Sequence, residues 1–263
     1  MIKVVVIILF SIIFGFNSVY AEQIFISVTG TADIIIFDGK WTSSPEWKQS
    51  TEEKLTFDDG SEMAFRISHN YENIFVMINY ISDKTLSNMA DQGVICIDSK
   101  ADGGDYPQKD DYCFLIAVGS KHPITLQGGH FLAPSGYFKK IENHPGLIAA
   151  GGLSDENDRY SKTPHITYEF KIPLEIIGKS DRYGLYFHAF DANSGTVKTW
   201  PKNIAKDMPP FIPEPNKWGE LISPDKSIPE FQFPLVMFAA LAFIIILSRR
   251  IGFSAGSRIF HST

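Results

Sequence analysis

The sequence predicts an all-β domain, an antiparallel β-sandwich or jelly roll, with an N-terminal signal helix and one C-terminal transmembrane helix. Short segments rich in β-branched and aromatic residues recur at strand length. Clusters of Asp, Asn and Gly separate most of them, as between the strands of sandwich domains. Long segments with helical periodicity are absent between the two apolar ends of the chain.

The expected strands follow one another along the middle of the chain. The segment 63–68 alternates apolar and polar residues, which predicts one buried and one solvated face. Residues 70–73 predict a hairpin turn, and short helices are expected only at 46–54 and 173–177. The strands are expected at residues 33–37, 63–68, 74–81, 94–97, 112–118, 166–172 and 185–190.

The N-terminus has the three parts of an export signal. Lys3 precedes an apolar run at residues 4–16, and small side chains at Val19 and Ala21 suit a signal-peptidase site. We therefore expect residues 1–21 to be a signal peptide, with an uncleaved membrane anchor as the alternative.

The C-terminal region predicts a single membrane span. Residues 231–248 contain no charged side chain, and Arg249 and Arg250 follow directly. The positive-inside rule then places residues 249–263 in the cytoplasm and the domain outside the cell. A proline-containing linker is expected at 223–230, so the folded domain spans 22–222. The apolar run and its arginines resemble the C-terminal anchors of archaeal surface proteins, some of which are replaced by lipid.

The charge distribution limits the class of partner. All 30 acidic residues lie between the apolar ends, and the chain has a formal net charge of −6. This balance argues against nucleic acid as a partner, because phosphates favour basic surfaces. It suits a soluble surface that could attract cations.

The two cysteines, Cys96 and Cys113, fall in successive predicted strands. In an exported chain, an even cysteine count favours a disulfide. A bridge that closes a loop of roughly 17 residues contributes about 3 kcal/mol in the chain-entropy model. Two buried free thiols are the alternative.

Six short motifs occur in order along the chain: Asp-Gly-Lys-Trp (38–41) with Pro-Glu-Trp (45–47), the hairpin 65–78, the strand 94–98, the segment 168–174, Trp200-Pro201, and the closing segment 215–221. Together they resemble family 9 carbohydrate-binding modules, which belong to the DOMON-like superfamily. The resemblance extends over residues 34–222. It implies a β-sandwich that binds carbohydrate without catalysis, and an association with polysaccharide breakdown, since such modules accompany glycoside hydrolases.

The resemblance also implies a set of ligand-binding residues. The family holds a terminal sugar between two tryptophans, and Trp200 stands where one of them is expected. Asp91, Asp191 and Asn193 are the polar candidates, although each could simply form a turn. Residues 88–91, where the second tryptophan is expected, contain no aromatic residue. Trp47 and Trp218 match framework positions and are expected in the core, and Glu169 is expected to have a framework role.

The loop 98–111 is rich in carboxylates. Extracellular Ca²⁺ takes six to eight oxygen ligands from loops of this kind, and calcium sites occur in the family. The alternative is a solvated acidic loop. The candidate ligands are Asp98, Asp102, Asp105, Asp110 and Asp111.

Two further functions remain open at this stage. The same superfamily includes haem-binding electron-transfer domains, but no pair of His or Met residues stands out as axial ligands. A structural protein associated with a surface layer is the other alternative. An enzyme is not expected, because the chain has no nucleophile elbow, phosphate loop or zinc motif.

Overall fold

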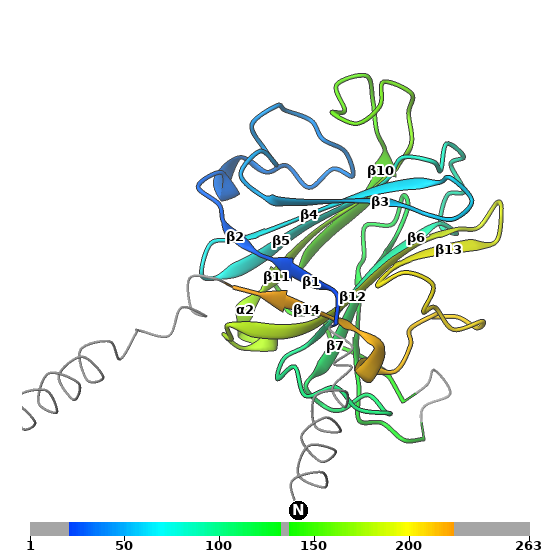
Figure 1. Ribbon diagram of the computed structural model, residues 1–263. Coiled ribbons are helices and arrows are strands. Elements are labelled where there is room, and N and C mark those ends of the chain that lie inside the picture. The colour runs from blue at the N-terminus through cyan, green and yellow to red at the C-terminus, as the bar shows by residue number, and fades with distance from the viewer. Residues whose placement is uncertain (1–20, 133–136, 224–263) are drawn as a thin grey trace, which may run out of the picture. The chain divides into compact units, whose positions relative to one another are not determined.

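The computed structural model describes residues 21–132 and 137–223, which form two β-sheets packed face to face (Figure 1). The elements are β1 (Gln23–Phe25), β2 (Ser27–Val28), η1 (Ala32–Ile34), β3 (Thr51–Thr56), β4 (Glu62–His69), β5 (Asn73–Tyr80), β6 (Gln92–Asp98), β7 (Asp111–Ala117), β8 (Ile124–Gln127), β9 (Lys139–Ile141), β10 (Ile148–Leu153), β11 (Ile166–Pro173), α2 (Leu174–Ile177), β12 (Arg182–Asp191), β13 (Thr196–Trp200), η2 (Pro215–Lys217) and β14 (Gly219–Ile222).

Each sheet has a continuous centre and short outer strands. Sheet A has the order β1-β14-β12-β6-β7-β8-β9, and β13 pairs with the same edge of β12 as β14. Sheet B has the order β10-β11-β5-β4-β2, and β3 also pairs with β4. Most pairs are antiparallel, but β1 pairs with β14 and β2 with β4 in parallel. The sheets are therefore mixed, whereas the sequence predicted antiparallel pairing throughout.

The main core lies between the sheets and follows the period of two expected for strands. In β4 the core residues are Met63, Phe65 and Ile67, so every second side chain points inward. Phe65 of sheet B stacks on Phe187 of sheet A, with ring centroids 3.8 Å apart. Stacked aromatic pairs of this kind contribute beyond the apolar area that they bury.

The outer faces of both sheets are also covered. Residues 29–50 pack over sheet B, where Trp41 and Trp47 form a second cluster with Phe75 and Met77. Glu169 of β11 anchors residues 29–50 to sheet B. Its carboxylate accepts hydrogen bonds from the Gly39 N–H (2.9 Å) and the Trp47 indole N–H (3.2 Å). The carboxylate is buried, so these donors replace the water that it has lost. Glu169 therefore fixes the covering segment to the sheet.

A third cluster covers sheet A and contains the disulfide. Cys96 of β6 and Cys113 of β7 are direct cross-strand partners and are bonded. Trp218 packs into the same cluster and donates from its indole nitrogen to the Pro213 carbonyl. The predicted disulfide and the core position of Trp218 are confirmed.

Six of the predicted strands, from 63–68 to 185–190, correspond to β4, β5, β6, β7, β11 and β12. The strand predicted at 33–37 was wrong: the chain forms η1 there, and Ile35 then packs on the outer cluster. The helix predicted at 46–54 was wrong: residues 46–49 form turns, and β3 begins at Thr51. The helix at 173–177 is confirmed by α2.

The predicted signal peptide (1–21), linker (223–230), transmembrane segment (231–248) and tail (249–263) lie outside the described residues, apart from Ala21 and Ser223. Within the described residues, none of the helices has the length and apolar character needed to span a bilayer.

The close approach of the two sheets depends on Gly93 of β6. A Cβ at this position would lie 2.3 Å from Cγ of Tyr168 in β11, well inside contact distance. We predict that Gly93→Ala lowers the free energy of unfolding by about 2 kcal/mol or more, because the buried ring must move. Chemical denaturation measures this loss.

The matched control is Gly30→Ala, whose Cβ would meet only the Gln49 side chain, at 3.2 Å. The control should stay within about 0.5 kcal/mol of the parent. Equal stability of the two variants would contradict the assignment of Gly93 as the contact between the sheets.

Candidate functional site

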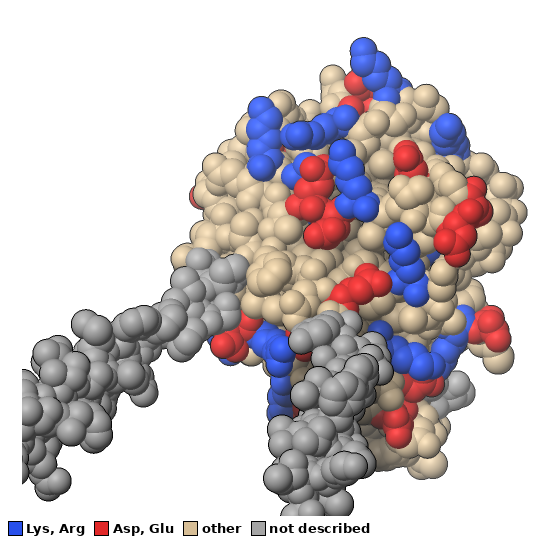
Figure 2. Space-filling view, viewed as in Figure 1, with Lys and Arg blue, Asp and Glu red and all other residues tan. Residues whose placement is uncertain are grey.

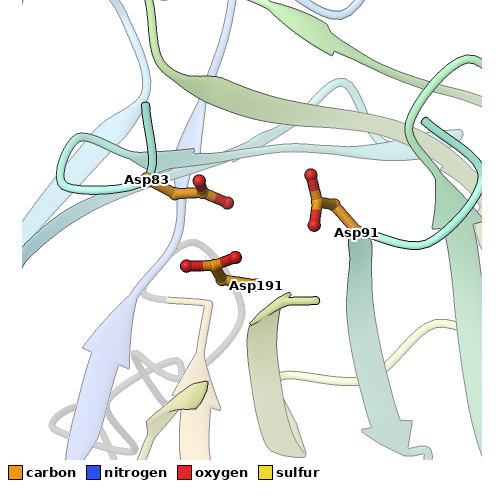
Figure 3. A group of neighbouring side chains, drawn as sticks. All are labelled: Asp83, Asp91 and Asp191. Atoms are coloured by element: carbon orange, nitrogen blue, oxygen red, sulfur yellow. The ribbon is translucent and has the colours of Figure 1, made fainter. Parts of the chain in front are cut away.

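Three aspartates from separate segments meet at one end of the sandwich (Figure 3). Asp83 follows β5 of sheet B, Asp91 precedes β6 of sheet A, and Asp191 ends β12. Their relative exposures are 3%, 0% and 8%. One carboxylate oxygen from each lies within 4.8 Å of the others. We call Asp83, Asp91 and Asp191 the aspartate cluster.

Local turns orient the carboxylates of the cluster. Asp91 accepts hydrogen bonds from the Ser87 N–H (2.7 Å) and from the Ala192 N–H (2.9 Å), which ties it to the turn after β12. Asp191 accepts from the N–H groups of Asn193 and Ser194 and from the Ser194 hydroxyl. These neutral donors fix the side chains but bring no positive charge.

Asp83 is the least satisfied member of the cluster. Its Oδ1 accepts from the Thr85 N–H at 3.1 Å, but its buried Oδ2 has no hydrogen-bond partner. Burial, together with the charges of Asp191 and Asp91, raises the pKa of Asp83 to about 7. The hydroxyl of Tyr168 is also buried without a partner. Burial raises the pKa of Tyr168, as do the charges of the three aspartates.

Trp200 lies in the core. It is 3% exposed and stacks on Phe187, with ring centroids 5.6 Å apart. The indole ring also lies against the backbone of Gly219, where a Cβ would be only 2.3 Å from it. The ring has no exposed face, which does not agree with the sugar-binding position expected from the sequence.

The three polar residues that were expected to bind a ligand do not all lie at one site. Asp91 and Asp191 lie close together, but they are buried and form a cluster with Asp83. The Asn193 side chain is instead exposed, in the turn after β12. Asp83 was not predicted as a site residue from the sequence. The sequence does contain one signal for Asp83: it lies just after the strand predicted at 74–81, and aspartates at strand ends lie together at the edges of sheets.

The acidic loop brings together three of its five aspartates, Asp98, Asp102 and Asp110. Asp98 is buried and accepts hydrogen bonds from the backbone N–H groups of Lys100, Ala101 and Gly103. Lys100 lies 3.4 Å from Asp110, so the group contains its own counter-charge.

The remaining two aspartates of the loop have other contacts. Asp105 accepts from the Asn216 side chain at 2.7 Å. Asp111 accepts from the Gln108 N–H, and burial raises the pKa of Asp111 to about 8. Calcium binding by this loop stays a prediction.

The same loop forms one wall of an open cleft of about 470 Å³. Tyr106 and Phe131 line the cleft with 53% and 70% of their surfaces exposed. Tyr137 packs edge-on against both rings, at 4.9 and 5.6 Å. We call this site the Tyr106 cleft; it is lined by Gly104, Asp105, Tyr106, Pro107, Gln108, Lys109, Gly129 and Phe131.

The walls of the Tyr106 cleft are fixed to each other by backbone contacts. The Gly129 N–H donates to the Pro107 carbonyl and the Gly128 N–H to the Asp111 carbonyl, both at 2.9 Å. A Cβ on Gly128 would lie 2.3 Å from the Gln108 carbonyl oxygen, so only glycine permits this approach. This site was not predicted from the sequence, although Tyr106 stands among turn-forming residues, where an aromatic side chain is a signal for binding.

A second cleft, with a volume of about 750 Å³, lies near α2. Its walls include His144 and Glu175, which contact each other at 3.0 Å, and they contain no Trp, Tyr or Phe. This cleft therefore offers no aromatic ring to a ligand.

Comparisons with known proteins give only distant likenesses. No family model matches the chain, and no curated protein matches it. A family 9 carbohydrate-binding module from Caldicellulosiruptor kristjanssonii in complex with glucose is 13% identical, with a TM-score of 0.48, over 80% of this chain and 100% of the module. The module in complex with cellotriose is also 13% identical, with a TM-score of 0.47, over 79% of this chain and 98% of the module.

A crystal structure of a protein from Bacteroides uniformis is 14% identical, with a TM-score of 0.46, over 77% of this chain and 99% of that one. Similarities at this level assign neither a ligand nor a site residue to the chain.

The core position of Trp200 has a measurable consequence. We predict that Trp200→Ala lowers the free energy of unfolding by about 3–5 kcal/mol, the usual cost of deleting a large buried ring. Denaturant titration is the measurement, with the exposed Asn193→Ala as a control that should change stability by less than about 0.5 kcal/mol. A Trp200→Ala variant as stable as the parent would show that the ring is not part of the core.

Proposed function

We propose that this chain is a non-catalytic carbohydrate-binding protein of the cell surface and that the Tyr106 cleft is its sugar site. The observation that carries the proposal is the pair of exposed aromatic rings, Tyr106 and Phe131, in a cleft that also contains Asp105, Gln108 and Lys109. Sugars present C–H faces that pack on aromatic rings, and hydroxyls that need polar partners. The ordered sequence motifs support the same class of ligand.

The cleft has the features of a preformed binding site. Tyr137 packs against both rings and limits their rotation, so less conformational entropy is lost on binding. Asp105 is held by Asn216, whose own N–H donates to the Gly104 carbonyl at 3.0 Å. The polar groups therefore come from a loop that the rest of the domain supports.

The expected membrane anchor belongs to this proposal. A tether at residues 231–248 would hold a binding domain at the cell surface without an attached enzyme.

The surface of the domain suits a solvated environment: Lys, Arg, Asp and Glu side chains are interspersed on the face in Figure 2. A role beside polysaccharide-degrading enzymes is part of the same proposal.

We predict that the full chain binds a member of a glycan panel that includes glucose and cello-oligosaccharides, as measured by titration calorimetry. Tyr106→Ala and Phe131→Ala should each weaken binding by about tenfold or more, because each removes a stacking face. Tyr106→Phe keeps the ring and should retain most of the affinity.

The matched control is Tyr71→Ala, which removes an exposed aromatic side chain from the β4–β5 turn of sheet B. This variant should bind like the parent. No binding across the panel, or unchanged binding by Tyr106→Ala, would contradict the proposal. A Soret band in the purified protein would instead favour the haem-binding alternative.

A further inference from the structure

The aspartate cluster combines three buried carboxylates without a basic partner. Among the described residues, none of the ion pairs includes Asp83, Asp91 or Asp191. The hydrogen bonds that the carboxylates accept come from backbone N–H groups and one hydroxyl. Isolated buried charges of one sign are costly unless a counter-charge or a metal ion is present.

We propose that the aspartate cluster binds one Ca²⁺ ion and that the ion links the two sheets. The candidate ligands are all oxygen atoms, which hard cations prefer and which do not favour zinc or copper. Ca²⁺ stands 2.3–2.6 Å from its ligands, so two oxygens on opposite sides of the ion are about 4.6–5.2 Å apart. The three oxygens of the cluster lie within 4.8 Å of one another, which matches that span.

A second observation, separate from the clustering, points to a missing ligand. Oδ2 of Asp83 is buried and has no hydrogen-bond partner, and Figure 3 shows the carboxylate directed toward Asp91 and Asp191. Buried polar atoms without partners are rare in folded proteins. The Tyr168 hydroxyl is a second buried polar group without a partner that feels the charges of the cluster. An ion among the three carboxylates would give Oδ2 of Asp83 the partner that it lacks.

Ca²⁺ fits this site better than Mg²⁺. Mg²⁺ requires near-octahedral ligands about 2.1 Å away and keeps several of its own waters. The cluster is buried and its carboxylates are fixed by short turns, which suits an ion that accepts irregular coordination. A cation there would also neutralise most of the charge that the site buries.

The ion would have a structural role. Residues 84–90 carry the chain from sheet B to sheet A, and the cluster holds both ends of this crossing, Asp83 and Asp91. Leu86 and Met89 are exposed on the crossing, so apolar packing does little to fix it. Asp191 lies at the start of the turn after β12. One ion bound to all three aspartates would therefore connect three segments of the chain.

This site is distinct from the acidic loop. Asp91 precedes β6 and Asp98 ends it, so the two groups lie at opposite ends of one strand. At about 3.3 Å per residue, that strand separates them by roughly 20 Å. The acidic loop also contains Lys100, whereas the aspartate cluster contains no base.

The test uses the full chain after removal of metal with a chelator. We expect one Ca²⁺ to bind by calorimetry at neutral pH, and about 1 mM Ca²⁺, the range of extracellular modules, to raise the melting temperature by several degrees. Asp83→Asn should weaken Ca²⁺ binding by at least about tenfold and abolish this rise. In chelator, the same variant should melt at or above the parent, because it removes a buried charge.

Asp102→Asn is the matched control, since it removes one aspartate from the acidic loop. This variant should keep the Ca²⁺-dependent rise. A crystal structure of the parent grown with Ca²⁺ gives an independent result if Asp83→Asn fails to fold: an ion among the three carboxylates is expected.

Three outcomes would overturn the proposal. The first is no Ca²⁺-dependent change in the melting temperature of the parent chain. The second is a change that Asp102→Asn abolishes and Asp83→Asn leaves intact, which would assign the ion to the acidic loop. The third is a cluster without an ion in the crystal, whose carboxylates share protons instead. None of these results depends on sugar binding, which is measured separately.

Discussion

The contact between Tyr168 and Gly93 fixes how the two sheets meet. The ring of Tyr168, in sheet B, lies directly on the backbone of Gly93, in sheet A, where any side chain would collide with it. Gly93 stands two residues after Asp91, so the same contact brings the rim of sheet A close to the end of β5. The close approach of the sheets is therefore part of what brings Asp83 of one sheet near Asp91 of the other.

The central strands could be predicted from the sequence because each of them carries its own signal. The alternation in 63–68 reflects burial against the opposite sheet on one face, but its other face is covered as well, so the predicted solvated face was wrong. The run in 112–118 is apolar throughout because one face packs in the main core and the other in the disulfide cluster. The edge strands β1, β2 and β9 are two or three residues long, too short for any period to appear. The segment 33–37 has the composition of a strand because it covers an outer face, and covering segments and strands bury the same residue types.

The candidate sites could be predicted less well, because their residues meet only in the folded chain. The disulfide was predictable since its cysteines lie in successive strands. Trp200 was assigned by its place in a motif, whereas its burial depends on the stacking of its ring on Phe187, a residue that lies outside every motif. Asp83 and Asp191 are more than 100 residues apart in the sequence. Phe131 joins Tyr106 only because β8 pairs with β7 and returns the chain to the acidic loop.

The positions of the two proposed sites explain how they could act independently. The Tyr106 cleft follows the end of β6 at Asp98, whereas the aspartate cluster precedes its start at Gln92. Between them, β6 is a central strand that pairs with β12 and β7 and is bonded to β7 through Cys96. A strand held on both sides transmits little movement from one end to the other. An ion in the cluster would therefore stabilise the domain without reshaping the cleft, and sugar affinity should change little with Ca²⁺ while the melting temperature rises.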